Sequence, residues 1–314
     1  MKYTLSFIVS FICLQCFAQL TVANDGSGKY TTIQAALDAI PSNNKKNTTI
    51  LVKPGIYKEV ITVDATKKHI TLKGTDTKAT VITFNNHAGT RLPNGDTLNT
   101  WTCATAFVYG DDFTAENITF LNDAGFTAGQ AVALRVEGNR AAFKSCAMIG
   151  FQDVLFVSGS GVKQYFKDCY IEGTTDFIFG AATAYFQDCR IHSKKNSHVT
   201  AASTNIIIPF GFVFNNCRLT ADSNVNKVSL GRPWSPTASV TYLNCFIDKH
   251  IIPEGWSNWK NPANEATARF AEYKCTGPGA NTSSRYLWTK QLSDKEATLY
   301  AIENVLGAWK PYKQ

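Results

Sequence analysis

One short motif recurs five times in the middle of this 314-residue chain. Each copy is an aromatic residue, two variable residues and a cysteine, and successive copies are 23, 20, 28 and 28 residues apart. The copies are Phe143-Lys-Ser-Cys146, Phe166-Lys-Asp-Cys169, Phe186-Gln-Asp-Cys189, Phe214-Asn-Asn-Cys217 and Tyr242-Leu-Asn-Cys245. A period of 20 to 50 residues is typical of a solenoid, in which each repeat is one coil that packs only against its neighbours.

The coils are predicted to be β-strands, because the segments around the motif, such as 141–149 and 211–219, alternate in polarity and are rich in β-branched and aromatic residues. Equivalent positions on stacked coils lie about 4.8 Å apart. We therefore expect the five cysteines to form a buried column of reduced thiols, with oxidation of neighbours as the alternative. Upstream, Asn117 is placed in the cysteine slot, whereas Cys103 and Cys275 fall outside the pattern.

Two segments carry helix-start signals that suit caps for the open ends of a solenoid. Thr31-Thr-Ile-Gln34 precedes apolar residues at helical spacing, and Ser293-Asp-Lys-Glu296 does so near the C-terminus. Both match the capping box. The fold predicted from the residues is thus an all-β solenoid with a short capping helix at each end.

Residues 1–18 have the features of an export signal, with Lys2, an apolar run over 5–13 and a cleavage site ending at Ala18. The run is shorter than the ~20 residues that span a bilayer. We predict a signal peptide at 1–18, a single catalytic β-helix domain at 19–314, and secretion to the extracellular space or, in a bacterium, the periplasm. No later stretch is apolar enough to anchor the mature chain in a membrane.

The formal net charge of +7 suits an acidic partner, but the sequence has none of the dense basic tracts of nucleic-acid-binding proteins. We therefore expect no nucleic-acid partner. The chain also lacks a G-x-S-x-G nucleophile elbow, an H-E-x-x-H zinc motif and a P-loop, and its five histidines are scattered. Serine-based and metal-based hydrolysis are not predicted.

Two carboxylates occupy the same slot of consecutive coils. Asp153 lies seven residues after Cys146, and Asp176 lies seven residues after Cys169. Side chains one coil apart would share a proton near neutral pH, which is a catalytic dyad. Gln152 directly precedes Asp153, and Gln130 lies 23 residues before it, so we expect both amides on the same face. A purely structural aspartate ladder is the alternative.

Taken together, the motifs resemble those of pectin methylesterases (pectinesterases, carbohydrate esterase family 8). The resemblance covers nearly all of the mature chain. It is carried by Asp25-Gly-Ser-Gly28, Gly55-Ile-Tyr-Lys-Glu59, Asn117-Ile-Thr-Phe, Gln130-Ala-Val-Ala-Leu134, Gly150-Phe-Gln-Asp-Val-Leu155, Asp176-Phe-Ile-Phe-Gly180 and Leu230-Gly-Arg-Pro-Trp234.

The resemblance implies a right-handed parallel β-helix that hydrolyses the C6 methyl esters of polygalacturonate in pectin, without metal or cofactor. We expect a monomer whose partner is methyl-esterified pectin. By motif, Asp176 resembles the nucleophile and Asp153 the general acid and base. Gln130 and Gln152 resemble the oxyanion donors. Arg232 resembles the partner that ionises Asp176, and should lower the pKa of Asp176 while that of Asp153 is raised.

Four aromatic residues are expected at the substrate. Trp234 and Trp256 resemble residues that stack on the sugar rings. Phe151 and Phe156 stand where the family commonly has tyrosine, so they keep a stacking surface but lack a hydroxyl.

Two other classes of function also fit the sequence. A pectate or pectin lyase or a polygalacturonase would share the β-helix and the acidic substrate, and a non-catalytic carbohydrate-binding solenoid would keep the ladder and the aromatics.

Overall fold

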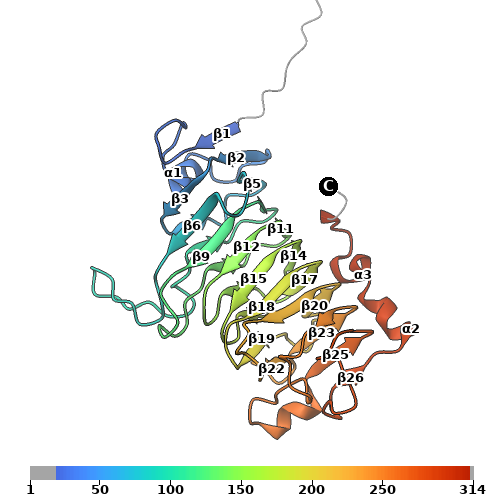
Figure 1. The fold of residues 1–314 in the computed structure, drawn as a ribbon. Coiled ribbons are helices and arrows are strands. Elements are labelled where there is room, and N and C mark those ends of the chain that lie inside the picture. The colour runs from blue at the N-terminus through green and yellow to red at the C-terminus, as the bar shows by residue number, and fades with distance from the viewer. Residues whose placement is uncertain (1–18, 312–314) are drawn as a thin grey trace, which may run out of the picture.

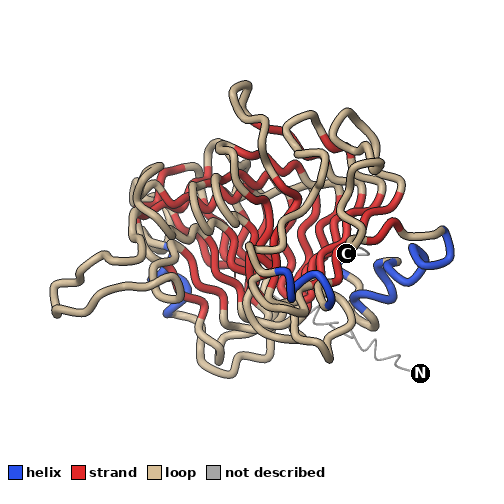
Figure 2. The backbone as a smooth tube through the Cα atoms, turned by 90° about the horizontal axis from the view of Figure 1, so that it is seen from below, coloured by secondary structure: helices blue, strands red, loops and turns tan. Residues whose placement is uncertain are grey.

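The computed structural model describes residues 19–311. The signal peptide predicted at 1–18 lies outside the described residues. Three parallel sheets run the length of the molecule and enclose one apolar core. Figure 1 shows the coils stacked one after another from β1 to β26, and Figure 2 shows the strands forming the body while the helices lie at its periphery.

Sheet A has eleven strands: β1 (Gln19–Val22), β2 (Thr48–Val52), β5 (Ile70–Lys73), β8 (Thr114–Glu116), β11 (Ala141–Lys144), β14 (Lys163–Lys167), β17 (Thr183–Gln187), β20 (Phe212–Asn215), β23 (Ser239–Leu243), β25 (Arg269–Tyr273) and β26 (Lys290–Gln291). Sheet B has eight: β3 (Gly55–Lys58), β6 (Thr80–Phe84), β9 (Thr119–Asn122), β12 (Ala147–Ile149), β15 (Tyr170–Gly173), β18 (Arg190–Ser193), β21 (Arg218–Ala221) and β24 (Phe246–Ile247).

Sheet C has seven strands: β4 (Ile61–Val63), β7 (Ala106–Val108), β10 (Leu134–Val136), β13 (Leu155–Val157), β16 (Ile178–Gly180), β19 (His198–Ala202) and β22 (Ser229–Pro233), with β22 at one edge. Each complete coil contributes one strand to A, then B, then C. The fold is therefore the right-handed parallel β-helix that was predicted.

The recurrent motif forms the corner between sheets A and B. Its aromatic rings stack from coil to coil, as in the 4.7 Å separation of the Phe166 and Phe186 centroids. Each thiol points at a carbonyl of the preceding coil; the Sγ of Cys189, for example, lies 3.5 Å from the oxygen of Phe166. The predicted column is confirmed, since all five thiols are buried and free. Cys275 extends the column by one more coil, with its Sγ 3.6 Å from the oxygen of Tyr242.

The residue before each ladder cysteine has a positive φ angle, which bends the chain from sheet A into sheet B. These residues are Ser145, Asp168, Asp188, Asn216, Asn244 and Lys274. Asn and Asp tolerate this left-handed conformation better than most residues. Asn117 also has a positive φ, 58°, and the strand register pairs Ala115 with Phe143. Ile118, not Asn117, therefore occupies the cysteine slot, so the predicted position was wrong by one residue.

The N-terminal helix, α1 (Ile33–Asp38), packs its apolar face into the first coil. Its N-cap is Thr32, whose side chain accepts from the amide of Ala35. The predicted capping box at Thr31 does not form, because the carboxylate of Glu59 accepts the amides of Ile33 and Gln34 instead.

The C-terminal segment forms three short helices: α2 (Asp294–Ala297), η2 (Thr298–Tyr300) and α3 (Ile302–Leu306). The capping box of Ser293 and Glu296 is present as predicted. These helices do not close the end of the solenoid, however. Val305 and Leu306 pack against the outer face of sheet A, and the oxygen of Leu306 accepts from the ammonium of Lys163. A single capping helix was therefore the wrong expectation. A further 3₁₀ helix, η1 (Pro262–Ala266), lies in the segment between β24 and β25.

Candidate active site

A cavity of about 300 Å³ opens on the outer face of sheet C. Four of the five predicted catalytic residues come from the coils of β13, β16 and β22, and Gln130 comes from the segment before β10. All five line the cavity, which is bordered by Thr100, Trp101, Gln130, Gln152, Asp153, Asp176, Phe179, Ala201, Arg232, Trp234 and Trp259.

The two aspartates face the cavity from equivalent positions on neighbouring coils. The register of β13 and β16 pairs Leu155 with Ile178, so Asp153 and Asp176, each two residues earlier, are also aligned. Both have positive φ angles, 62° and 50°. The shared slot that the sequence predicted is confirmed.

Arg232, on the edge strand β22, forms an ion pair with only one of the two aspartates. Its Nε donates to Oδ1 of Asp176 at 3.0 Å, and its Nη2 donates to Oδ2 at 2.6 Å. The guanidinium also lies 3.6 Å from the centroid of the Trp259 ring. A fork held at both oxygens and covered on one face fixes the plane of the Asp176 carboxylate.

The pKa values of the two carboxyls differ because their surroundings differ. Burial, together with the negative charge of Asp176, raises the pKa of Asp153 to about 8. Burial also raises the pKa of Asp176, although the hydrogen bonds and the charge of Arg232 act in the opposite direction. Arg232 thus acts on the pKa of Asp176 in the expected direction, but desolvation outweighs the arginine, so the net shift is upward. The expected rise for Asp153 is confirmed.

Gln130 and Gln152 form an isolated parallel bridge between neighbouring coils, and both line the cavity. The side chain of Gln152 acts to lower the pKa of Asp153, against the larger effects of burial and of Asp176. Gln130 therefore aligns with Gln152, whereas its sequence spacing had aligned it with Asp153. The two amides are on the same face as the aspartates, and their N–H groups can donate hydrogen bonds to a negative charge that develops in the cavity.

Aromatic side chains form one side of the cavity. Trp234 is 40% exposed, and its ring lies 6.2 Å from that of Trp101, which is 47% exposed. Phe156 is only 3% exposed and stacks on Phe179 at 4.3 Å. Phe156 thus supports the tryptophans from below instead of offering a surface of its own. Phe151 is not among the residues that line the cavity; its ring lies beneath the ammonium of Lys194.

Trp256 does not serve the site as predicted. It is 1% exposed, its ring stacks on Phe270 at 4.4 Å, and its Nε1 donates to Glu272. A side chain so deep in the core has no surface for a sugar ring. Trp259, three residues further on, is the tryptophan of this segment that lines the cavity.

Two further residues of the cavity, and a histidine in the aspartate slot that does not line it, were missed from the sequence. Thr100 and Trp101 come from the long loop between β6 and β7, which is drawn in teal in Figure 1 and lies outside the repeat. His198 occupies the aspartate slot one coil after Asp176, and its Nδ1 lies 2.7 Å from the hydroxyl of Ser229. Burial, with the nearby charge of Arg232, lowers the pKa of His198 to about 4, so the ring is neutral at neutral pH. The repeat spacing does not identify His198, because seven residues after Cys189 comes Asn196; only the strand register aligns His198 with Asp176.

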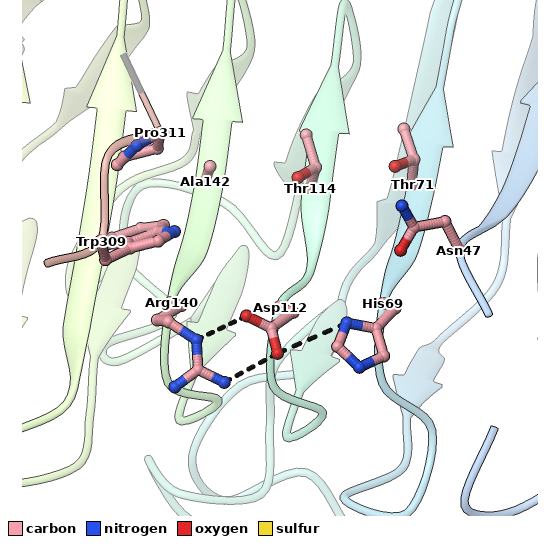
Figure 3. Close-up of a pocket in the computed structure, with 9 residues that line it drawn as sticks. All are labelled: Asn47, His69, Thr71, Asp112, Thr114, Arg140, Ala142, Trp309 and Pro311. Carbon is pink, nitrogen blue, oxygen red and sulfur yellow. Dashed lines mark hydrogen bonds and ion pairs between the residues drawn. The ribbon is translucent and has the colours of Figure 1, made fainter. Parts of the chain in front are cut away.

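A second hollow, on the outer face of sheet A, also gathers charged side chains (Figure 3). Arg140 donates to both oxygens of Asp112, at 2.5 and 2.7 Å, and Nδ1 of His69 lies 3.5 Å from Oδ2. The hydrogen bonds from Arg140 lower the pKa of Asp112. Asp112 is the one carboxylate among the described residues that line this hollow, so an acid and a carboxylate cannot work there as a pair.

Within residues 19–311, no group of three or more His, Cys, Asp or Glu side chains is arranged to hold a metal ion. In the same part of the chain, no helix is long and apolar enough to cross a membrane.

Comparison with known proteins agrees with this geometry. The sequence profile of the family Pectinesterase matches residues 19–308. Pectinesterase 31 of Arabidopsis thaliana is 42% identical over 284 residues, which cover 88% of each chain. The chain belongs to the pectinesterase family.

Solved pectin methylesterases share the fold over almost the whole chain. The enzyme from carrot superposes with a TM-score of 0.86 at 35% identity, covering 92% of this chain and 94% of the carrot protein. PemA from Erwinia chrysanthemi gives a TM-score of 0.83 at 32% identity, with coverages of 93% and 98%. As a member of the pectinesterase family, the protein is a carboxylic ester hydrolase.

Proposed function

We propose that this esterase hydrolyses the methyl esters of galacturonate in pectin, with Asp176 as nucleophile and Asp153 as general acid and base. The observation that carries the proposal is a buried pair of aspartates of which only one is held by an arginine fork. A solved pectin methylesterase that is 32% identical to this chain is described in complex with a hexasaccharide. That likeness supports an oligosaccharide substrate for the cavity.

In the first half-reaction, an oxygen of the Asp176 carboxylate bonds to the ester carbonyl carbon. The carbonyl oxygen becomes a tetrahedral oxyanion, which the side-chain amides of Gln130 and Gln152 stabilise by hydrogen bonding. Asp153 is protonated at neutral pH because its pKa is about 8. As the bond between carbon and methoxy oxygen breaks, Asp153 gives this proton to the leaving oxygen, and methanol departs.

In the second half-reaction, water hydrolyses the acyl-enzyme. Asp153, now a carboxylate, takes a proton from the attacking water. The bond to Asp176 breaks, and Asp176 leaves as a carboxylate that Arg232 stabilises. The products are the free galacturonic acid group and methanol, and both aspartates return to their starting protonation states.

The assay is methanol release from esterified pectin, followed beside the appearance of unsaturated and of reducing chain ends. We expect one methanol for each carboxylate formed and no new ends. New unsaturated ends would instead indicate a lyase, new reducing ends a polygalacturonase, and binding without any product a non-catalytic solenoid.

We also propose that the chain is exported and acts as a monomer. Export is supported by the signal-like composition of residues 1–18. N-terminal sequencing of the exported protein should begin at Gln19, and its mass in solution should be that of one chain.

A further inference from the structure

The wall of the cleft that carries Trp101 comes from a long loop without strands of its own. This loop, residues 85–105, connects β6 to β7 and is longer than most loops of compact domains. Near Trp101 its hydrogen bonds are mostly local: the amide of Trp101 donates to the side chain of Asn99, and Thr102 bonds back to Asn99. Local bonds shape the turn but do not fix where it lies relative to the sheet.

Long-range bonds fix the end of the loop, from Cys103 to Gln130 and from Thr105 to Val132, and one reaches Trp101 itself. Nη1 of Arg135, on β10, donates to the carbonyl oxygen of Trp101 at 2.5 Å. Arg135 itself is clamped, because its Nη2 donates to Glu137 at 2.6 Å. Its guanidinium also lies 5.5 Å from the centroid of Tyr109 and 5.3 Å from that of Phe156.

The clamp makes Arg135 a rigid support. Only 14% of its side chain is exposed, and a cation so deeply placed needs an anion and hydrogen-bond acceptors to offset its desolvation. Glu137 and the Trp101 carbonyl supply them. Because the guanidinium is a planar fork, Glu137 on one nitrogen sets the direction in which the other nitrogen points.

Arg135 does not line the cavity around the two aspartates, so it can act there only through other residues. The ring of Trp101 lies 6.4 Å from Phe156 and 6.2 Å from Trp234. We propose that Arg135 is a positioning residue: it holds the backbone of Trp101 so that the exposed indole stays beside Trp234 as one wall of the substrate cleft. The inference rests on the proposed function, because the wall is needed only if sugar rings bind there.

The test compares Arg135→Met with Trp101→Ala and with the double variant on a soluble, highly esterified galacturonan. Loss of a charge-assisted hydrogen bond predicts that Arg135→Met raises KM by about tenfold. The kcat should change less than threefold, because the aspartate pair keeps its own contacts. In the double variant, KM should equal that of Trp101→Ala alone, since the two residues act in series.

Two more variants keep the test decisive if Arg135→Met folds poorly. Arg135→Lys retains the charge but loses the fork, and Glu137→Gln weakens the clamp, so both should raise KM by smaller factors. Arg140→Met is the matched control. It breaks the ion pair with Asp112 on the outer face of sheet A, away from the cavity, and should leave KM unchanged.

Several results would overturn the proposal: additive effects in the double variant, a fall in kcat at constant KM, or a loss of thermal stability with KM unaltered. If the parent releases no methanol at all, the proposed function fails. If the parent is active and the Arg135 variant has a normal KM, only the role of Arg135 fails.

Discussion

Two arginine–aspartate forks in this molecule have nearly the same geometry and opposite electrostatic outcomes. Arg232 holds Asp176 at 3.0 and 2.6 Å, and Arg140 holds Asp112 at 2.5 and 2.7 Å. Yet the pKa of Asp176 is raised and that of Asp112 is lowered.

The difference comes from burial. The side chain of Asp176 is 8% exposed and that of Asp112 is 23% exposed. At Asp112, the hydrogen bond from Arg140 is the largest influence, whereas at Asp176 desolvation is. Where solvent reaches the carboxylate, the arginine sets the direction of the net pKa shift. Where the carboxylate is buried, the arginine offsets only part of the desolvation cost, and the net pKa rises. The buried fork also has a second carboxyl beside it, Asp153, which can hold a proton.

The largest contrast should appear when each aspartate is neutralised. Asp176→Asn removes the nucleophile and should lower kcat for methanol release by about a thousandfold or more, while binding of pectin persists. Asp112→Asn, with the same change of charge and shape, should leave kcat within about twofold. Initial rates and pectin binding of the two purified variants give the answer. Substantial turnover by Asp176→Asn would remove this residue from the mechanism.

The arginines should show the next largest contrast. Arg232→Lys replaces a fork by a point charge and should lower kcat/KM by about a hundredfold, whereas Arg140→Lys should have little effect. Because Arg232 acts to lower the pKa of Asp176, Arg232→Gln should raise that pKa and shift the acidic limb of the kcat/KM profile to higher pH. If the limb stays in place while the rate falls, Arg232 only orients the substrate.

The smallest contrast concerns stability against pH. The pKa of Asp153 is raised to about 8, so its contribution to stability is complete below the unfolded pKa near 4 and is lost as the pH rises through 8. Asp153→Asn should therefore lose less Tm than the parent between pH 7 and 9, by on the order of 2–4 °C. The same pKa predicts that activity of the parent falls on the alkaline side of 8.

Asp112 should behave in the opposite way. Its lowered pKa stabilises the fold above the unfolded pKa, and this contribution is lost as the pH falls. Asp112→Asn should flatten the acidic part of the Tm curve and leave the alkaline part unchanged. The measurement is the Tm of the parent and of both asparagine variants from pH 3 to 9. If the two variants show the same dependence of Tm on pH, burial does not distinguish the two forks.

The repeat made most of the central fold predictable. A spacing of seven residues after a ladder cysteine placed Asp153 and Asp176 in one slot, because parallel coils repeat their geometry at every step. Alignment of the motif failed at Asn117, where the bend residue was mistaken for the ladder residue. The other copies already carried the missing signal, since Ser, Asp or Asn precedes each of the five cysteines and each adopts a positive φ.

Regions outside the repeat were the hardest to predict. Trp256 and Trp259 lie three residues apart in an irregular segment, and nothing local shows which of them turns into the core. Trp101 lies in a loop with no periodicity, so its place beside Trp234 follows only from tertiary contacts. The net pKa shift of Asp176 was missed for a related reason, because burial is a property of the whole fold and the motif shows only the arginine.

The position of β22 at the edge of sheet C has a consequence for how the enzyme loses activity. In a stack of coils, opening begins at the ends and proceeds inward. Asp153 and Asp176 precede interior strands, β13 and β16, but Arg232 lies on the edge strand itself. Strands β23, β25 and β26 and the segment 250–257 lie beyond β22, so fraying from the C-terminal side would release them first and would then reach Arg232 before either aspartate. Amide hydrogen exchange should therefore be faster in β22 than in β13. On heating, catalytic activity should be lost at a lower temperature than most of the strand structure.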